Sequence, residues 1–150
     1  MSQISLSQFA DKLNQLMPQI LRGFMHRQTN ELFKGKITLP QFLILNFLSK
    51  EGESKMTSLA HFLEVSTPAA TGIVDRLVRY GYLTRVFYPQ DRRIIKIRLT
   101  AKGLALVHKT IQQKRQNIVH VFSQISEKER GEYLKILMRI RDIIAQEKKA

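Results

Sequence analysis

The sequence contains no cysteine, few acidic residues and no long apolar run. Without cysteine the chain can form neither disulfides nor a thiol redox switch. No apolar run reaches the roughly 18 residues that a transmembrane helix needs. The N-terminal segment has neither a basic leader nor the apolar stretch of a signal peptide. We therefore expect a cytoplasmic protein with no membrane partner.

The sequence also lacks the short motifs of common catalytic and metal sites. It has no glycine-rich phosphate loop, no nucleophile elbow and no paired Cys/His motif. Of the four scattered histidines, His108 and His120 fall on one expected helix but about 18 Å apart, too far to share a metal ion. A metal site assembled from different helices is the alternative. We expect no enzyme activity, no cofactor and no metal site.

The shortage of acidic residues gives the chain a strong positive charge. There are 12 Asp and Glu against 25 Lys and Arg, so the formal net charge is +13. The excess is concentrated, because residues 75–115 hold eleven basic and two acidic residues. Such a surface is typical of proteins that bind polyanions, with a solvated surface kept for solubility as the alternative.

The middle of the chain predicts a helix end, a hairpin and a new helix. Gly81 ends a helix, and extended runs follow at Leu83–Tyr88 and Arg93–Leu99. Pro89 opens the turn between them, and Thr100 is a typical N-cap for the next helix. A helix, a hairpin with a cationic tip and another helix are the pattern of a winged helix-turn-helix.

Upstream of the hairpin, apolar spacing predicts the helix Pro68–Tyr80, with Thr67 as its N-cap. The residues that we expect on its buried side are Ala70, Ile73 or Val74, Leu77 and Tyr80. The opposite side carries small, hydroxyl and basic residues, which let a helix enter a major groove closely. The expected DNA contacts of this segment are Ser66, Thr67, Pro68, Ala69, Thr71, Gly72 and Arg76.

Two capping boxes mark further helix starts. One pairs Thr38 with Gln41, and the other pairs Ser126 with Glu129. The apolar run Phe42–Leu48 after the first box needs burial on most sides, so we expect a scaffold helix there.

The order of these features resembles the MarR family of transcription regulators. The matching marks are Asp75-Arg76-Leu77, Gly81-Tyr82-Leu83 with Arg85, Asp91-Arg92-Arg93, and Leu99-Thr100 followed by Gly103. Any one mark is a weak signal, whereas four in register with the expected strands and turn are a strong one. The lack of cysteine excludes the thiol mechanism of the family's peroxide-sensing branch.

The resemblance implies a mainly α-helical fold with a small β-wing, in one MarR-like domain over residues 1–150. The winged helix-turn-helix would span about residues 38–100, and helices at about 4–33 and 104–147 would form a dimerisation layer. Both terminal segments carry more apolar surface than one small domain can cover, although mutual burial within one chain is the alternative. Pro18 is expected to kink or split the first helix. The expected dimer contacts are Leu6, Phe9, Leu13, Leu134, Leu137, Met138 and Ile144.

The resemblance further implies a homodimeric repressor that binds a palindromic operator in double-stranded DNA and responds to a small aromatic acid or phenolic effector. The expected wing contacts are Arg85, Asp91, Arg92 and Arg93. Arg93 would enter the minor groove, while Asp91 would orient an arginine by a charge-assisted hydrogen bond. No local motif marks the effector cleft, so its residues stay unknown. The alternative is a basic winged-helix module that binds another protein or RNA.

Overall fold

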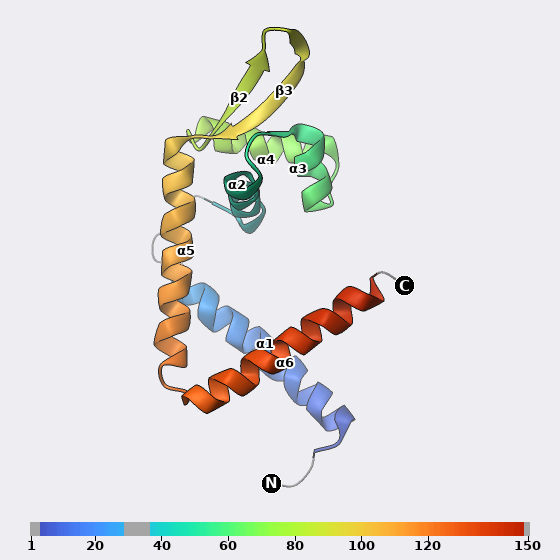
Figure 1. The fold of residues 1–150 in the computed structure, drawn as a ribbon, viewed down its shortest axis with the longest axis vertical. Coiled ribbons are helices and arrows are strands. Elements are labelled where there is room, and N and C mark those ends of the chain that lie inside the picture. The colour runs from blue at the N-terminus through green and yellow to red at the C-terminus, as the bar shows by residue number, and fades with distance from the viewer. Residues whose placement is uncertain (1–3, 29–36, 149–150) are drawn as a thin grey trace. The chain divides into compact units, whose positions relative to one another are not determined.

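A computed structural model describes residues 4–28 and 37–148 (Figure 1). The chain divides into two compact units, residues 1–113 and 114–150, which are described separately. The elements follow one another as α1 (Leu6–Gln28), α2 (Leu39–Glu51), β1 (Ser54–Lys55), α3 (Met56–Leu63), α4 (Thr67–Arg79), β2 (Leu83–Tyr88), β3 (Asp91–Leu99), α5 (Ala101–Phe122) and α6 (Glu127–Glu147). The predicted fold class, mainly α-helical with a small β-wing, is confirmed.

Both predicted capping boxes start helices. At α2, the Thr38 hydroxyl accepts from the Gln41 amide at 3.4 Å, and the Gln41 side chain accepts from the Thr38 amide at 2.9 Å. At α6, Ser126 and Glu129 make the same reciprocal pair at 3.3 and 3.0 Å. These bonds satisfy amides that a helix start leaves without partners, so the local sequence alone determines both starts.

The cap of α4 lies one residue earlier than predicted. The hydroxyl of Ser66, not that of Thr67, accepts from the Ala69 amide at 3.3 Å. Thr67 therefore begins the helix and Pro68 follows as its second residue. A hydroxyl can cap only the amide two or three positions ahead, and Ser66 has the extended backbone that this geometry requires.

The turn between α3 and α4 contains a residue in the left-handed conformation. Glu64 has φ 55° and ψ 41°. Its amide donates to the His61 carbonyl at 3.1 Å, and the Val65 amide donates to the Ala60 carbonyl at 3.0 Å. These bonds occupy carbonyls at the end of α3 and close the turn, so the helix pair forms with glutamate where glycine would be less strained.

The apolar core of the first unit joins α2, α3, α4, the sheet and the start of α5. In α4, Ala70 and Leu77 are fully buried as predicted, whereas Tyr80 is 45% exposed and its predicted burial was wrong. The reason is that α4 ends at Arg79, and the chain then turns through Gly81 at φ +80°. The core consists of Ile37, Ile44, Leu45, Leu48, Leu59, Val74, Leu77, Leu83, Ile97 and Val107.

The wing is a three-stranded antiparallel sheet in the order β1-β3-β2, and its β2–β3 hairpin extends away from α3 and α4 (Figure 1). The prediction missed the two-residue strand β1, in which Ser54 pairs with Ile97. Strand β3 begins at Asp91 instead of Arg93, because the turn is confined to Pro89 and Gln90. The β2–β3 register is regular from Leu83↔Leu99 to Phe87↔Ile95 and then shifts to Tyr88↔Asp91.

Pro18 was predicted to kink or split the first helix, and α1 runs through it without a break, so the split does not occur. Proline removes one amide donor, and the remaining bonds hold the two halves together. The kink stays a prediction. In the part of the chain that the structure describes, no helix is long and apolar enough to span a membrane.

Candidate nucleic-acid interface

The predicted contact residues at the start of α4 are accessible to solvent. Six of them are exposed and Thr71 is half-buried. The Thr71 hydroxyl donates to the Thr67 carbonyl at 2.9 Å, so its oxygen remains available to accept a hydrogen bond. Because Ala70, Val74 and Leu77 fix the opposite side of the helix in the core, this side is held outward.

The N-terminus of α4 has little free capacity for phosphate. Pro68 carries no amide hydrogen, and the Ala69 amide already donates to Ser66. Of the first three residues of α4, only Thr67 therefore keeps a free backbone donor. Further along the helix, the exposed Arg76 and Arg79 carry the positive charge. Contacts with a polyanion would depend mainly on side chains here.

An ion pair ties the hairpin to α4. The guanidinium of Arg85 on β2 donates to the carboxylate of Asp75 on α4. Both side chains are partly exposed, so the pair contributes at most about 1 kcal/mol to stability. Its main effect is geometric, since it connects the predicted recognition helix to the wing. The DNA contact predicted for Arg85 stays a prediction, and it would require the guanidinium to bind Asp75 and a phosphate at the same time.

The wing tip presents two arginines without ion-pair partners. Asp91, Arg92 and Arg93 are all exposed, and neither arginine forms an ion pair with another residue that the structure describes. The Asp91 carboxylate accepts a hydrogen bond from the backbone amide of Arg93 at 2.9 Å. The orienting role of Asp91 stays a prediction. In the structure its carboxylate holds the backbone of Arg93 and not a guanidinium.

Three side chains that sequence analysis missed form a wing brace: Glu53, Tyr88 and Arg98. The Tyr88 hydroxyl donates to Glu53 Oε2 at 2.6 Å, while the Arg98 guanidinium donates to Glu53 Oε1. The bonds from Tyr88 and Arg98 lower the pKa of the Glu53 carboxyl, and the bond to Glu53 raises the pKa of the Tyr88 hydroxyl. The partners lie 35 and 45 residues from Glu53, so no local pattern could have revealed the brace.

The start of α5 is fastened to the end of α4. The Thr100 hydroxyl donates to the Gly81 carbonyl at 2.7 Å and accepts from the Gly103 amide at 3.1 Å, as its predicted N-cap role requires. The ammonium of Lys102 donates to the Tyr80 carbonyl at 2.8 Å and lies 4.8 Å from the centre of the Tyr82 ring. These contacts join the separate sequence marks around Gly81, Thr100 and Gly103 into one structural unit.

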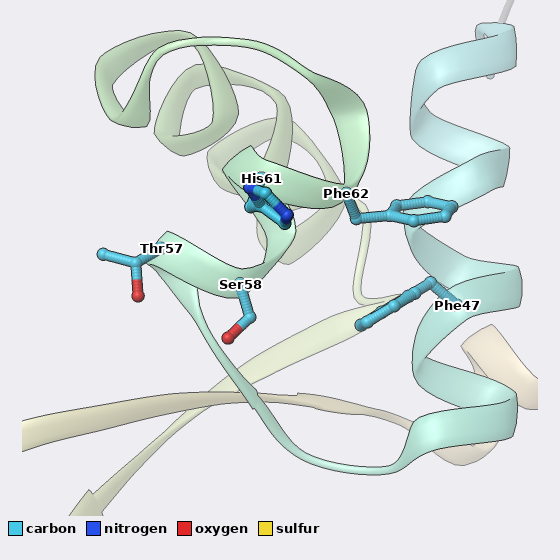
Figure 2. A pocket seen from close by; sticks show the side chains of 5 residues that line it. All are labelled: Phe47, Thr57, Ser58, His61 and Phe62. Carbon is cyan, nitrogen blue, oxygen red and sulfur yellow. The ribbon is translucent and has the colours of Figure 1, made fainter. Parts of the chain in front are cut away.

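A shallow depression lies between α2 and α3, and Figure 2 shows the five side chains that line it: Phe47, Thr57, Ser58, His61 and Phe62. The rings of Phe47 and Phe62 lie 4.5 Å apart and form its apolar part. Thr57, Ser58 and His61 are exposed, and the depression is open to solvent. Across residues 4–28 and 37–148, no cluster of His, Asp and Glu is arranged to hold a metal ion.

The predicted dimer contacts are exposed in the single chain. On α1, Phe9 and Leu13 are 48% and 40% exposed. On α6, where no residue is buried, Leu137 and Met138 are 40% and 48% exposed. Leu6, Leu134 and Ile144 are more exposed still. Both helices thus present apolar side chains that a single chain leaves in contact with water.

Comparisons with known proteins agree with this geometry. Residues 37–95 match the family model described as MarR family. Over 79 residues the chain is 37% identical to the HTH-type transcriptional regulator YpoP of Bacillus subtilis (strain 168), and this match covers 53% of the chain and 56% of YpoP. Over 134 residues it is 28% identical to the HTH-type transcriptional repressor YetL of the same organism, covering 89% of the chain and 75% of YetL.

The fold comparison extends over nearly the whole chain. The crystal structure of RV1404 from Mycobacterium tuberculosis has a TM-score of 0.80 and 26% sequence identity, covering 95% of this chain and 96% of that one. The family match itself runs from the start of α2 into β3, which is the segment that carries the exposed α4 surface and the wing tip. The chain therefore belongs to the MarR family of winged helix-turn-helix transcription regulators, a family of DNA-binding proteins and not of enzymes.

Proposed function

We propose that the chain forms a homodimer that binds a palindromic operator in double-stranded DNA and represses transcription. In this proposal α4 enters the major groove and the wing tip enters the flanking minor groove. The observation that carries it concerns Arg92 and Arg93, which are exposed and form no ion pair with another described residue. Both lie at the tip of a hairpin that Arg85 ties to α4. One rigid unit would thus present a groove-sized helix and a cationic tip together.

The charges of this unit support binding to duplex DNA. Arg76 and Arg79 on α4 and Arg92 and Arg93 on the wing are exposed and without ion-pair partners among the described residues. Guanidinium groups are weakly hydrated and suit the negative potential of a narrow minor groove. Arg76 would contact the half-site core, whereas Arg93 would sense the flanking sequence.

The exposed apolar residues of α1 and α6 support the homodimer. A helix whose apolar residues cover more than one face needs a partner surface, and a second copy of the chain offers an identical one. In such a dimer, two winged helix-turn-helix units related by a twofold axis would bind a palindromic site. Repression is further supported by the similarity to the repressor YetL.

We further propose that a small aromatic acid or phenolic effector regulates the protein, because some regulators of the MarR family bind such compounds. Such a ligand would bind more tightly to a dimer conformation in which the two α4 helices are not spaced to enter successive major grooves. It would thereby weaken operator binding. Salicylate-like compounds at millimolar concentration are the probes to titrate against the protein–operator complex. Ligand binding that leaves DNA affinity unchanged would contradict this part of the proposal.

The decisive experiment compares two duplexes at one salt concentration: the region upstream of the gene and a random sequence of equal length. Specific binding of the upstream region supports the proposal. Equal affinity for both duplexes, or tighter binding to RNA, would contradict it. If a dimer makes about 6–10 phosphate contacts, affinity should fall roughly 10³–10⁵-fold between 50 and 200 mM salt. A flat salt response would indicate a protein partner instead.

A further inference from the structure

The wing brace connects all three strands of the wing through one carboxylate. Glu53 directly precedes β1, Arg98 lies near the end of β3, and Tyr88 is the last residue of β2. Because β3 is the central strand, Glu53 has to reach past it to contact Tyr88. Gly52, at φ +77°, makes the turn that leads from α2 to Glu53.

The outer part of the wing has few other constraints. Between Phe87 and Tyr88 the register shifts, so residues 92–94 have no paired residue on β2. Phe87 is 61% exposed and Ile95 is 39% exposed, so little apolar packing holds the strands at this level. A two-stranded ribbon without such support is marginally stable in water. The hydrogen bond from Tyr88 to Glu53 therefore anchors the wing just before the turn.

The brace also determines which basic side chains are free. Arg98 pairs with Glu53, and the ammonium of Lys96 lies 5.2 Å from the centre of the Tyr88 ring. Arg85 pairs with Asp75. Among the wing residues that the structure describes, Arg92 and Arg93 are the arginines that stay unpaired, and both follow the braced Tyr88 closely in the chain.

We propose that Glu53 is a positioning residue of the DNA-binding wing: by holding Tyr88 and Arg98 it sets the orientation in which Arg92 and Arg93 meet the minor groove. This inference deepens the DNA-binding function proposed above and rests on it. A wing already held in place loses less conformational freedom on binding, so the brace strengthens the complex without touching DNA.

Charge and positioning predict opposite effects at Glu53. A carboxylate near DNA repels phosphates, so its removal would tighten binding if charge alone mattered. If positioning dominates, Glu53→Ala weakens operator binding by about 3- to 10-fold, the range expected for loss of one or two hydrogen bonds. Glu53→Gln removes the same charge but keeps an oxygen that can accept from Arg98, so it should recover part of the loss.

Two further variants separate the brace from simple electrostatics. Tyr88→Phe removes only the hydroxyl and changes no formal charge, yet it should weaken operator binding about 2- to 5-fold. Glu51→Ala removes a carboxylate from the exposed end of α2, and this carboxylate forms no hydrogen bond or ion pair with another residue that the structure describes. Its affinity should stay unchanged or increase slightly.

A double-mutant cycle identifies the group that is positioned. On an Arg93→Ala background, Glu53→Ala should change affinity less than twofold, because the arginine that depends on the brace is gone. In the free protein, amide hydrogen exchange of residues 92–95 should be faster in Glu53→Ala than in the wild type, with the global melting temperature preserved.

The outcomes distinguish this inference from the function on which it rests. Wild-type protein that binds no duplex specifically would refute the DNA-binding function. Wild-type binding that Glu53→Ala leaves unchanged or tightens would refute only the positioning role. An equal loss in the wild-type and Arg93→Ala backgrounds would also refute it, because Glu53 would then act independently of the wing tip.

Discussion

At the scale of single residues, Asp91 shows how an acid can contribute to a DNA-binding tip. Its carboxylate accepts from the Arg93 amide at 2.9 Å and so fixes the backbone that carries the arginine. An asparagine oxygen can accept the same bond without the negative charge. The contribution of geometry can therefore be measured apart from that of charge.

We expect Asp91→Asn to bind the operator as tightly as the wild type or more tightly, and Asp91→Ala to bind less tightly. Arg93→Ala should weaken binding further and relax the preference at flanking A·T positions, without changing the melting temperature. Fluorescence anisotropy at fixed salt measures all three. If Asp91→Asn and Asp91→Ala tighten binding equally, charge alone explains the residue.

Among the described glycines, Gly103 has the least space for an added side chain. A Cβ atom there would lie 2.2 Å from the Tyr82 carbonyl oxygen and 2.8 Å from Leu99 Cδ1. The start of α5 would have to move away from the end of α4. We expect Gly103→Ala to lower the free energy of unfolding by about 1–3 kcal/mol, measured by urea denaturation. An unchanged midpoint would mean that the junction between α4 and α5 adjusts freely.

At the scale of elements, α4 combines a buried side with an open one. A Cβ atom at Gly72 would meet nothing within 4 Å. Gly72→Ala should therefore stabilise the helix by about 0.5–1 kcal/mol. If α4 approaches the major groove closely at this point, the same methyl group weakens operator binding. Thermal melting and anisotropy on one sample test both effects, and unchanged affinity would place Gly72 outside the interface.

The stability of the wing should depend on pH. The pKa of Glu53 is lowered from 4.5, first by the bond from Tyr88 and then by Arg98. Its contribution is therefore present above pH 4.5 and is lost as pH falls through the lowered value. The pKa of Tyr88 is raised from 10.0, so its contribution is present below pH 10.0 and is lost as pH rises through the raised value.

NMR titration of 13C-labelled side chains can follow the protonation of Glu53 at low pH and the deprotonation of Tyr88 at high pH. In Tyr88→Phe, the high-pH transition of the wing should disappear, and the pKa of Glu53 should rise toward 4.5 because its largest stabilising bond is lost. A Glu53 pKa that is the same in both proteins would show that Tyr88 does not hold the carboxylate in solution.

At the scale of the whole molecule, we expect the exposed apolar residues of α1 and α6 to form the proposed dimer interface. If Leu137 is buried between two copies, Leu137→Ala should cost about 2–5 kcal/mol of dimer stability. Lys135→Ala on the same helix is the control and should cost little. Sedimentation and concentration-dependent melting measure the effect, and a loss below about 0.5 kcal/mol would place Leu137 on a free surface.

The sequence alone determined those parts of the protein that depend on neighbouring residues. The caps at Thr38, Ser126 and Thr100, the strand Leu83–Tyr88 and the buried side of α4 follow from hydroxyl positions and apolar spacing within one element. Short-range hydrogen bonds and periodic burial act over three or four residues, so a linear pattern records them. The family marks then indicated how these elements combine.

Only the tertiary structure decided which charged side chains form ion pairs and which remain available to a ligand. The pairing of Arg85 with Asp75 and of Arg98 with Glu53, and the two-residue strand β1, depend on segments that meet only after the core has formed. The predicted burial of Tyr80 was wrong for a related reason. A local pattern does not show where a helix stops packing against the core. Strand pairing and ion pairs across elements depend on distances in space, and the linear order of residues does not specify those distances.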